Sequence, residues 1–459
     1  MKLPAYPRYK PSGVEWLGDV PEHWSPKRFG YLFRFYSGGT PSTSEIELWD
    51  GELPWVSSKD MKSMVISDTV DHISEEAVRQ SSTCKLPAGS LLMVNRSGIL
   101  RHSIPAAVIT REMAINQDIR GCVPSSEVDS KFVVYLIEGN QPALLALWRQ
   151  QGATVESLTF ESVKTTNLHL PDPPEQRSIA AFLDRETGRV DRLVAKKREL
   201  IERLKEKRTA LISRTVTRGL PAEAAAKAGL PTNPPLKPSA LDWLDDIPKH
   251  WRVMRFRRLI TRLDQGWSPN ANNYPAATDE LGVLKLGAAS KGKFYPEDNK
   301  ALDDIPEGVI PITPASGDLL VSRANTPDFV GDACVVKGNY PNRIIPDLLY
   351  RLRLRADTNG DFVCWFLLSG LGRAQIECDA RGSSGSMVKL GQGHVRAWSL
   401  PFPPLPEQAA IAAYLDLETA KLDALVGKVE EAIERLQEYR TALITAAVTG
   451  KIDVRKHVT

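Results

Sequence analysis

Cysteine is scarce in this 459-residue sequence, and none of its five cysteines forms a CxxC pair. This spacing argues against a zinc ribbon and against a disulfide framework, so we expect buried free thiols. The seven histidines include no HExxH motif and no pair four residues apart, which leaves metal-site chemistry unsupported. The sequence therefore predicts no metal in this chain.

Long apolar runs are missing as well. No stretch approaches the roughly 18 to 20 uninterrupted apolar residues of a membrane span. The first 30 residues carry prolines, charges and tryptophans where a secretory signal would need a continuous apolar stretch. We expect a cytoplasmic protein of about two to four domains with no membrane partner. The net charge of +3 permits nucleic-acid binding without demanding it, because balanced charges can still segregate onto one face.

Catalytic motifs are also absent. There is no GxxxxGK[ST] phosphate loop, which excludes a nucleotide-driven motor on this chain alone. Two fragments, DPPE at 172–175 and NPPL at 233–236, resemble the (N/D)PP-aromatic motif of amino-methyltransferases. Both lack the aromatic residue that would stack on a target base, and no glycine-rich cofactor fingerprint precedes them. We therefore expect a non-catalytic chain that holds no cofactor of its own.

The chain contains an internal repeat. Residues 174–217 align without a gap to residues 406–449, and 27 of the 44 aligned positions are identical. A second match opens each half, where PSGVEWLGDVPEHW aligns with PSALDWLDDIPKHW. Between these anchors the halves diverge, although landmarks recur in order, such as Gly39 with Gly266. The chain is therefore two half-chains in tandem, a repeated scaffold that suits the reading of two different ligands.

Each half ends in a predicted long amphipathic helix, because apolar residues recur there in threes, fours and sevens. Proline-rich segments precede Glu175 and Glu407, which would then lie in the first helical turn, where the helix dipole favours an acid. The first helix is basic over 196–208 and the second is acidic over 430–438, a balance that suits helices that pack together. The expected packing residues are Leu183, Val190, Val194, Ile201, Leu204, Leu211, Leu415, Leu422, Val426, Ile433, Leu436 and Leu443.

The divergent regions read as mixed α+β globules. Short apolar strand-like runs alternate with Gly, Pro and Asn turns, and one helical segment falls near 132–147 or 362–371. The segment 218–237 is rich in Pro and Ala without periodicity, so we interpret it as a linker. His23 and His250 are expected to pack against the tryptophan that follows each of them.

This ordered set of segments resembles the specificity subunits of type I restriction-modification systems over nearly the whole chain. The resemblance rests on the WL…VPxHW or IPxHW openings, on PEQ followed by IAAxLD and a long helix, and on the tail TAAVTGKIDVR. No single motif is decisive, but the order is specific. The resemblance implies an α+β fold with two mixed α/β target-recognition domains, each of which reads one half of a split DNA site. Two long antiparallel helices, a coiled coil, would separate these domains, and the tandem repeat would have pseudo-two-fold symmetry.

The same resemblance implies partners. Double-stranded DNA, two methyltransferase (modification) subunits and restriction or translocase subunits are expected, and S-adenosylmethionine, ATP and magnesium would belong to those partner subunits. A helix over about 179–212 would be about 50 Å long, comparable with roughly one and a half turns of DNA. Two equivalent halves could also present two equivalent docking faces to two copies of a partner.

The anchors divide the chain into seven parts. These are an N-terminal arm (1–24), target-recognition domain 1 (25–173), a long spacer helix (174–217), a linker with a repeat of the arm (218–251), target-recognition domain 2 (252–405), a second spacer helix (406–449) and a C-terminal tail (450–459).

Candidate DNA-binding residues were selected by chemistry, since Arg and Lys contact guanine and phosphate, Asn and Gln contact adenine, and small polar residues contact phosphate. In the first half they are Ser37, Gly39, Thr40, Lys59, Asn95, Arg96, Ser97, Arg101, Arg149, Gln150, Gln151 and Thr154. In the second half they are Trp267, Asn270, Asn272, Asn273, Lys285, Arg323, Asn325, Arg381, Ser383, Ser384 and Lys389.

Three other classes of protein compete with this interpretation. A stand-alone repressor or an anti-restriction mimic would need no partner surface. A fused methyltransferase-nuclease would need the motifs that are missing. A structural coiled-coil adaptor would be favoured if the divergent regions were neutral or acidic on every face, but their loops rich in Asn, Arg, Gly and Ser argue for DNA binding.

Overall fold

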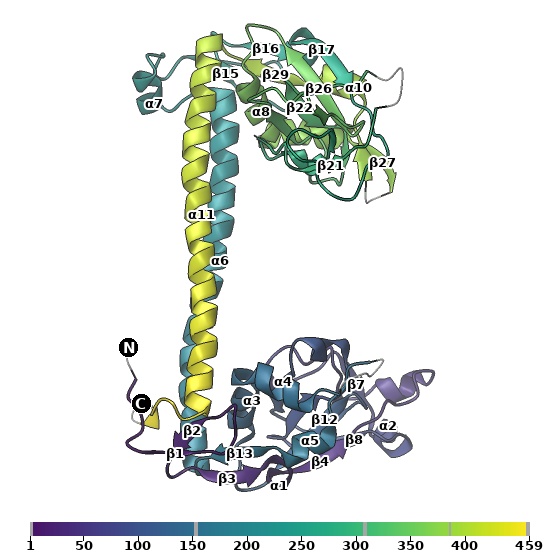
Figure 1. Cartoon of the computed structure of the whole chain (residues 1–459), viewed down its shortest axis with the longest axis vertical. Coiled ribbons are helices and arrows are strands. Elements are labelled where there is room, and N and C mark those ends of the chain that lie inside the picture. The colour runs from purple at the N-terminus through teal and green to yellow at the C-terminus, as the bar shows by residue number, and fades with distance from the viewer. Residues whose placement is uncertain (1–2, 151–154, 306–309, 385–386, 456–459) are drawn as a thin grey trace. The chain divides into compact units, whose positions relative to one another are not determined.

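A computed structural model describes residues 3–150, 155–305, 310–384 and 387–455. The chain divides into two compact units, unit 1 (1–198 and 430–459) and unit 2 (199–429). Each unit combines a mixed α/β domain with parts of two long helices (Figure 1). Among the described residues, no helix is long and apolar enough to cross a membrane.

Unit 1 contains two main sheets and two small ones. The five-stranded sheet has the order β4 (Phe33–Ser37), β12 (Ile119–Pro124), β9 (Leu91–Val94), β10 (Ala106–Ile109), β6 (Val65–Ile66), and the four-stranded sheet has the order β7 (Asp71–Ile73), β5 (Leu53–Val56), β11 (Met113–Ile115), β8 (Cys84–Leu86). The small sheets pair β1 (Tyr9–Pro11) with β2 (Asp19–Pro21) and β3 (Ser25–Arg28) with β13 (Asn167–Leu170). The helices are α1 (Phe29–Leu32), α2 (Glu75–Gln80), α3 (Ser130–Gly139), α4 (Gln141–Trp148), α5 (Phe160–Thr165) and the first part of α6 (Pro173–Arg218).

Unit 2 repeats the frame of unit 1. Its four-stranded sheet has the order β17 (Ile260–Gln265), β26 (Leu349–Leu354), β22 (Leu319–Ser322), β24 (Ala333–Val335), and its three-stranded sheet has the order β21 (Asn299–Ala301), β18 (Gly282–Leu284), β25 (Arg343–Ile344). Smaller pairings are β14 (Leu236–Lys237) with β15 (Ile247–Pro248), β16 (Arg252–Arg255) with β29 (Ser399–Phe402), β19 (Ala289–Ser290) with β20 (Lys293–Phe294), and β23 (Ala324–Asn325) with β28 (Met387–Lys389) and β27 (Arg381–Ser384). The helices are α7 (Ala222–Lys227), α8 (Gly360–Leu368), α9 (Gly370–Asp379), α10 (Gln392–Ala397) and α11 (Leu405–Val448), whose last part belongs to unit 1.

The strand registers show which residues of the two units correspond. A Cβ added to Gly38 would lie 1.9 Å from the carbonyl oxygen of Ile115, and one added to Gly266 would lie 1.9 Å from that of Ile345. Only glycine fits so close to a backbone carbonyl. The counterpart of Gly266 is therefore Gly38, and our alignment of Gly266 with Gly39 was wrong by one residue.

Two other local expectations were wrong. Each predicted single helix is broken in two, between α3 and α4 at Asn140 and between α8 and α9 at Ser369, whose backbone conformations are not helical. Pro142 in the first turn of α4 suits a new helix start, because the N–H that proline lacks has no helical partner there. The presumed linker is also not wholly irregular, since it contains the short helix α7.

The long helices form as predicted and extend one residue beyond the expected N-terminal bounds. Along α6 the expected packing positions are buried, from Leu183 (0% exposed) to Leu204 (8% exposed), or half-buried at Leu211. Along α11, Leu415 and Leu443 are buried, and the positions between them are half-buried. Each long helix buries one apolar stripe and exposes its other faces to solvent, which explains how such long helices are stable in water.

The two helices pair with antiparallel polarity inside each unit. In unit 1, Arg440 donates to Asp191 at 3.0 Å, and in unit 2, Arg208 donates to Asp423 at 3.1 Å. Asp191 precedes Arg208 along α6, whereas Arg440, the partner of Asp191, follows Asp423, the partner of Arg208, along α11. Asp191 and Asp423 are counterparts in the repeat, as are Arg208 and Arg440. Each repeat therefore contributes the same two charges, and each charge meets the opposite helix.

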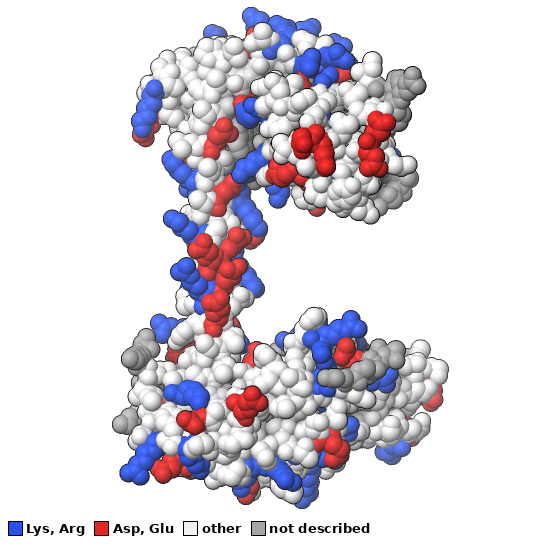
Figure 2. Space-filling model, viewed as in Figure 1, with Lys and Arg blue, Asp and Glu red and all other residues white. Residues whose placement is uncertain are grey.

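We expected the basic stretch of α6 to suit the acidic stretch of α11, and this expectation is wrong in detail. Exposed charges of both signs are interleaved along the helices (Figure 2). Among the ion pairs of the described residues, those of Arg203 and Lys205 are with glutamates of their own helix. None joins the acidic stretch of α11 to α6, and this stretch contains Glu430, Glu431, Glu434 and Glu438. Such exposed pairs within a helix contribute only about 0.3–0.5 kcal/mol each.

A buried carboxylate joins the N-terminal arm to α6 in unit 1. Glu175, 8% exposed, accepts hydrogen bonds from the Tyr6 hydroxyl at 2.7 Å and the Trp24 indole at 3.3 Å, and His23 Nε2 lies 2.8 Å from it. Burial, and then the hydrogen bond to Glu175, raise the pKa of Tyr6. His23 thus shares a carboxylate with Trp24, and its ring contact is with Tyr6, at 5.6 Å between ring centres.

Unit 2 repeats this junction. Glu407, 7% exposed, accepts from the Trp251 indole at 3.0 Å, and His250 Nε2 lies 2.8 Å away. Our expectation for His250 holds in part, since its ring also contacts Trp251 edge to face. The repeated His-Trp and PEQ segments are thus two ends of one contact.

The glutamine of each PEQ segment ties the long helix to the domain. The fully buried Gln176 accepts from the backbone N–H of Asp129, and Gln408 accepts from that of Asn359, both at 2.8 Å. Asp129 and Asn359 are the N-caps of α3 and α8. A single glutamine side chain therefore fixes the start of the helix that packs on the sheet.

Removal of the first junction is a direct test of its role in stability. We expect Glu175→Ala to lower the free energy of unfolding of unit 1 by about 3 kcal/mol, because buried donors lose their acceptor. Glu175→Gln should cost less, since its amide oxygen still accepts. Denaturant unfolding provides the measurement, with Glu15→Ala, at an exposed position, as the control. Equal stability of Glu175→Ala and Glu15→Ala would contradict the junction's role.

Candidate nucleic-acid interface

Three loops of unit 1 meet at one end of its sheets. They follow β4, β9 and β11, and backbone hydrogen bonds join them: Gly39 N–H donates to Ile115 at 3.1 Å, and Asn95 N–H donates to Asp118 at 2.7 Å. The Thr40 hydroxyl adds a hydrogen bond to the Gln117 side chain at 2.6 Å. Short polar loops held on a rigid strand frame are a common way to build a binding surface.

Unit 2 builds the same three-loop edge after β17, β22 and β25. Trp267 N–H donates to Ile345 at 3.0 Å, and Arg323 N–H donates to Leu348 at 2.8 Å. The Ser268 hydroxyl donates to the Asp347 carboxylate, which corresponds to the contact of Thr40 with Gln117 in unit 1. The backbone contacts are thus preserved while the side chains change.

A fourth segment completes each edge. In unit 1, Leu158 N–H donates to Asn95 at 2.9 Å and Ser97 N–H donates to Glu156 at 3.0 Å. In unit 2, Leu390 N–H donates to Arg323 at 2.8 Å, which places β28 beside β23. We call these four-segment surfaces reader edge 1 (residues 37–40, 95–101, 116–118, 149–150 and 155–158) and reader edge 2 (266–268, 323–325, 345–348, 381–384 and 387–390).

Most of the candidates in the first half lie on reader edge 1. Those placed together are Ser37, Gly39, Thr40, Asn95, Arg96, Ser97, Arg101, Arg149 and Gln150. Arg101 and Arg149 converge on the half-buried Glu156, at 3.2 and 3.9 Å. Lys59 lies elsewhere and pairs with Asp71 at 2.5 Å. Gln151 and Thr154 lie outside the described residues.

The candidates in the second half are divided. Trp267, Arg323, Asn325 and Lys389 belong to reader edge 2, as do Arg381, Ser383 and Ser384 of β27, although the side chains of these last three are outside the description. Other contacts engage part of the remainder, since Asn272 donates to Asp303 at 2.9 Å and Lys285 pairs with Asp298 at 3.2 Å. Asn270 and Asn273 are exposed in the same loop as Asn272. Trp267 is half-buried against Val283, Leu302 and Ile344, which gives it a packing role.

Sequence reasoning missed one basic residue beside reader edge 1. Arg120 lies opposite Ser37 on β12, donates to its hydroxyl, and stacks over the ring of Phe160 at 4.4 Å. Its Nε is buried without a hydrogen-bond partner, and burial lowers the pKa of the guanidinium. No sequence signal marked it, because it lies inside a run that reads as a buried strand.

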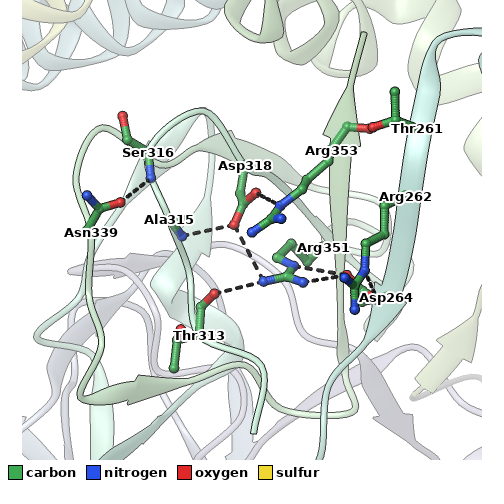
Figure 3. Close-up of polar contacts among 10 residues, drawn as sticks. All are labelled: Thr261, Arg262, Asp264, Thr313, Ala315, Ser316, Asp318, Asn339, Arg351 and Arg353. Atoms are coloured by element: carbon green, nitrogen blue, oxygen red, sulfur yellow. Dashed lines mark hydrogen bonds and ion pairs between the residues drawn. The ribbon is translucent and has the colours of Figure 1, made fainter.

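A network of charged side chains joins β17 to β26 around the buried Arg351 and Asp318 (Figure 3). Arg351, 6% exposed, donates to Asp264 at 2.6 Å and to the carbonyl of Thr313 at 3.0 Å, and lies 3.9 Å from Asp318. Asp318 also accepts from Arg353 at 3.1 Å. In the register of unit 1, the position of Arg351 is occupied by Gly121. The network is therefore a property of unit 2 alone among the described residues.

This network positions the start of the reader loop. Asp264 is two residues from Gly266 and also accepts from Arg262 at 2.8 Å. Burial alone would raise the pKa of Asp264, but hydrogen bonds from Arg351 and Arg262 outweigh it and lower that pKa. The charged form of the carboxylate is thus held where β17 enters the loop.

The described residues contain no group of three or more His, Cys, Asp or Glu side chains arranged to hold a metal ion. The free cysteines Cys122, Cys334 and Cys364 are buried, and burial raises the pKa of each thiol. They are thus unsuited to act as thiolate nucleophiles. What both edges share is a rigid backbone that presents variable polar and basic side chains.

Comparison with known proteins identifies this architecture. Residues 21–203 match the model of the type I restriction modification DNA specificity domain. The specificity subunit of the type I restriction enzyme EcoR124I/EcoR124II from Escherichia coli is 33% identical over 39% of this chain and 42% of its own length. The MjaVIII specificity subunit from Methanocaldococcus jannaschii is 20% identical over 95% of this chain and 94% of its own. The stronger sequence match therefore spans less than half the length of the relative.

Solved structures extend the likeness in fold to almost the whole chain. One chain, from a study of complex assembly and conformational transition in a type I R-M system, has a TM-score of 0.69 at 16% identity and covers 94% of this chain and 99% of its own length. The HsdS subunit from Thermoanaerobacter tengcongensis has a TM-score of 0.54, also at 16% identity, over 94% of this chain and 98% of its own. The likeness to these structures is one of fold. In sequence, residues 21–203 resemble the type I restriction modification DNA specificity domain, and the chain is similar to type I specificity subunits.

The charge network yields a stability prediction with a pH signature. We expect Asp264→Asn to lower the free energy of unfolding by about 3 kcal/mol at pH 7, because the buried Arg351 loses the nearer of its two carboxylate partners. The pKa of Asp264 is lower in the folded state. Its contribution is therefore complete above the unfolded value of about 3.9 and is lost as pH falls through the folded value. The difference between wild type and variant should shrink below about pH 4.

Urea unfolding at several pH values is the measurement, with Asp328→Asn, at an exposed position, as the matched control. A difference between wild type and Asp264→Asn that stays constant down to pH 3 would show that the carboxylate charge is not the source of the stability.

Proposed function

We propose that this chain is the non-catalytic DNA sequence-specificity subunit of a type I restriction-modification complex, in which each unit reads one half of a bipartite site. The observation that carries the proposal is the pair of reader edges. Both are built by the same backbone contacts on the same strand ends, yet their exposed side chains differ. A preserved frame with divergent polar loops is what the reading of two different base sequences requires.

The side chains at the edges suit DNA chemistry. Arg96, Arg101 and Arg149 of edge 1 and Arg323 and Lys389 of edge 2 offer donors for guanine and phosphate. Asn95, Gln150 and Asn325 offer the paired donor and acceptor that adenine needs. The stacked Arg120 adds a fixed cation beneath edge 1. We propose that the phosphate contacts set the position of the chain on the duplex and that the amides and guanidinium groups discriminate bases.

The long helices are proposed to set the spacer and to dock two methyltransferase subunits, and restriction or translocase subunits would join that assembly. S-adenosylmethionine, ATP and magnesium would then act in the partners. Support comes from exposed leucines at corresponding positions, since Leu193 of α6 is 42% exposed and Leu425 of α11 is 43% exposed. Because the repeat places one on each helix, one partner surface could recognise both.

An exchange of the first reader domain tests the proposal. The chain is co-expressed with the methyltransferase encoded beside it, and methylated adenines are mapped genome-wide for wild type and for a chimera that carries another family member's residues at positions 25 to 170. We expect a split motif in the wild type and a change in one half of it in the chimera. If no methylation depends on this chain, the specificity function is wrong and a stand-alone binder or adaptor replaces it.

Charge substitutions at the exposed leucines test the docking proposal. We expect Leu193→Asp and Leu425→Asp each to reduce the methyltransferase that copurifies from two copies to one, and the double variant to lose both, because a carboxylate is costly in an apolar contact. Mass measurement of the complexes reports the copy number. Lys197→Asp, on the same stretch of α6, is the control, and three indistinguishable complexes would place the docking surface elsewhere.

A further inference from the structure

A cleft of about 770 Å³ opens within unit 2 between the long helices and the α/β domain. One wall is formed by α6 and α11 and carries Lys205 and Arg208. The other includes Lys291 and Lys293 of the β19–β20 hairpin and the aromatic rings of Tyr295, Phe329 and Trp365. Lysines beside the exposed rings of Tyr295 and Phe329 form a surface that suits a polyanion. We call it the lysine cleft.

Three cations of the lysine cleft have no basic counterpart in unit 1. Gly292 N–H donates to Ala333 at 3.0 Å, and in unit 1 Val108 N–H donates to Met64 at 2.9 Å, so these two segments correspond. Ser63 and Val65 therefore occupy the positions of Lys291 and Lys293. On the helices, Gln437 replaces Lys205, whereas Arg440 preserves Arg208. Of the five basic residues that line the cleft, Lys205, Lys291 and Lys293 thus have no basic counterpart in unit 1.

The hairpin that carries the lysines holds a strained residue. Lys291 has φ of +49° and is followed by Gly292 with φ of +82°, the conformation of a two-residue turn in which Asn or Gly is preferred at the first position. A lysine is strained in this region of backbone conformation. The spacing GAASKGK partly matches a phosphate loop, but Phe294 stands where Ser or Thr is required, and the segment forms a hairpin.

The acidic residues of the cleft are mostly engaged by protein groups. Asp423 pairs with Arg208, Asp361 with Lys337, and Asp416 accepts from the Trp365 indole at 2.9 Å. Asp332, 6% exposed, accepts from the backbone of Lys291 and from Ser290. Asp328 is exposed at the rim. Among the described ion pairs, Lys291 and Lys293 have no carboxylate partner, and Lys291 lies 5.8 Å from the ring centre of Phe329.

The lysine cleft continues from reader edge 2 along one loop. Asn325 lies on the edge, and the same loop reaches Phe329 four residues later. Arg373 holds this loop through the carbonyls of Val330 and Pro327, at 2.5 and 3.0 Å. A duplex that leaves edge 2 toward the long helices would therefore pass the lysine cleft next.

We propose that the lysine cleft binds phosphates of the DNA spacer, the stretch between the two read halves, and that it does so on the unit 2 side only. The inference rests on the proposed function and deepens it. Lysine ammonium groups act as point charges, so these contacts add affinity without reading bases. The two halves of the site would thus be held unequally, with the stronger grip on the spacer beside the half that unit 2 reads.

The test uses the complete chain assembled with its methyltransferase and a duplex that carries the mapped site. Lys291→Asn and Lys293→Val are combined, because Asn tolerates the positive φ and Val is the residue of unit 1. We expect the slope of log affinity against log salt to become shallower by about 2, since each phosphate contact contributes about 0.9. The methylated motif should not change. Ethylation interference should lose phosphates of the spacer beside the half read by unit 2.

Lys205→Gln, which copies Gln437 on an exposed helix face, is a second variant and should make the slope shallower by about 1. Lys249→Ser, an exposed lysine of unit 2 outside the cleft, is the control for charge. An unchanged slope overturns the inference, as does loss of methyltransferase without loss of phosphate contacts, which would make the cleft a protein-docking site. Failure of the proposed function is distinct, because the wild-type complex itself would then show no preference for the mapped site.

Discussion

A buried glutamate at the start of each long helix is the contact on which the rest of each unit depends. Glu175 and Glu407 lie in the first helical turn, where the helix dipole stabilises a negative charge, and each carboxylate accepts an indole N–H and contacts a histidine from the arm. The next residue, Gln176 or Gln408, accepts from the N-cap backbone of the domain helix. Two adjacent side chains thus connect arm, long helix and domain. A mismatch at either would expose a buried donor.

This junction separates the invariant parts of the fold from the variable ones. The helix seam and the His-Trp pair of the arm use the same kinds of residue in both repeats, whereas the loops of the reader edges share mainly backbone hydrogen bonds. Backbone contacts tolerate almost any side chain, so loops can change chemistry without a change of frame. The Gly38 and Gly266 positions are the exception, because a Cβ there would overlap a carbonyl oxygen.

The sequence was sufficient to predict the elements whose local pattern occurs in both repeats. The long helices differ from the expected 174–217 and 406–449 by one residue at each end, since their apolar spacing and proline-rich starts are repeated. The pattern Asn-Gln-Pro could have predicted the helix break at Asn140, but the apolar run around it favoured the prediction of one continuous helix. The polar role of His23 could not be predicted from local sequence, because its partner Glu175 is 152 residues away along the chain. Proximity over such separations follows from tertiary packing and not from local spacing.

The reader edges show the same limit. Loops with Asn, Arg, Gly and Ser after apolar strands pointed to residues that do lie together, such as Thr40, Asn95 and Arg149. Arg120 was missed, because a strand residue reveals its direction only through its neighbours. Lys59 and Lys285 were chosen for charge, but each pairs with a nearby carboxylate.

Duplication explains both the symmetry and its failure. Asp191 with Arg440 and Asp423 with Arg208 are one contact made twice, and neither repeat could lose its charge without cost to the other. No such coupling protects a side chain that faces only solvent or ligand. Lys291 and Lys293, which have no carboxylate partner among the described residues, accordingly have no basic counterpart in unit 1. The buried Arg351 network is also found in unit 2 alone among the described residues, because its contacts stay within that unit. A duplicated scaffold keeps its symmetry where the repeats contact each other, and it diverges where a residue of one repeat has no contact with the other. We therefore infer that asymmetry within this chain marks the surfaces on which its two halves perform different tasks.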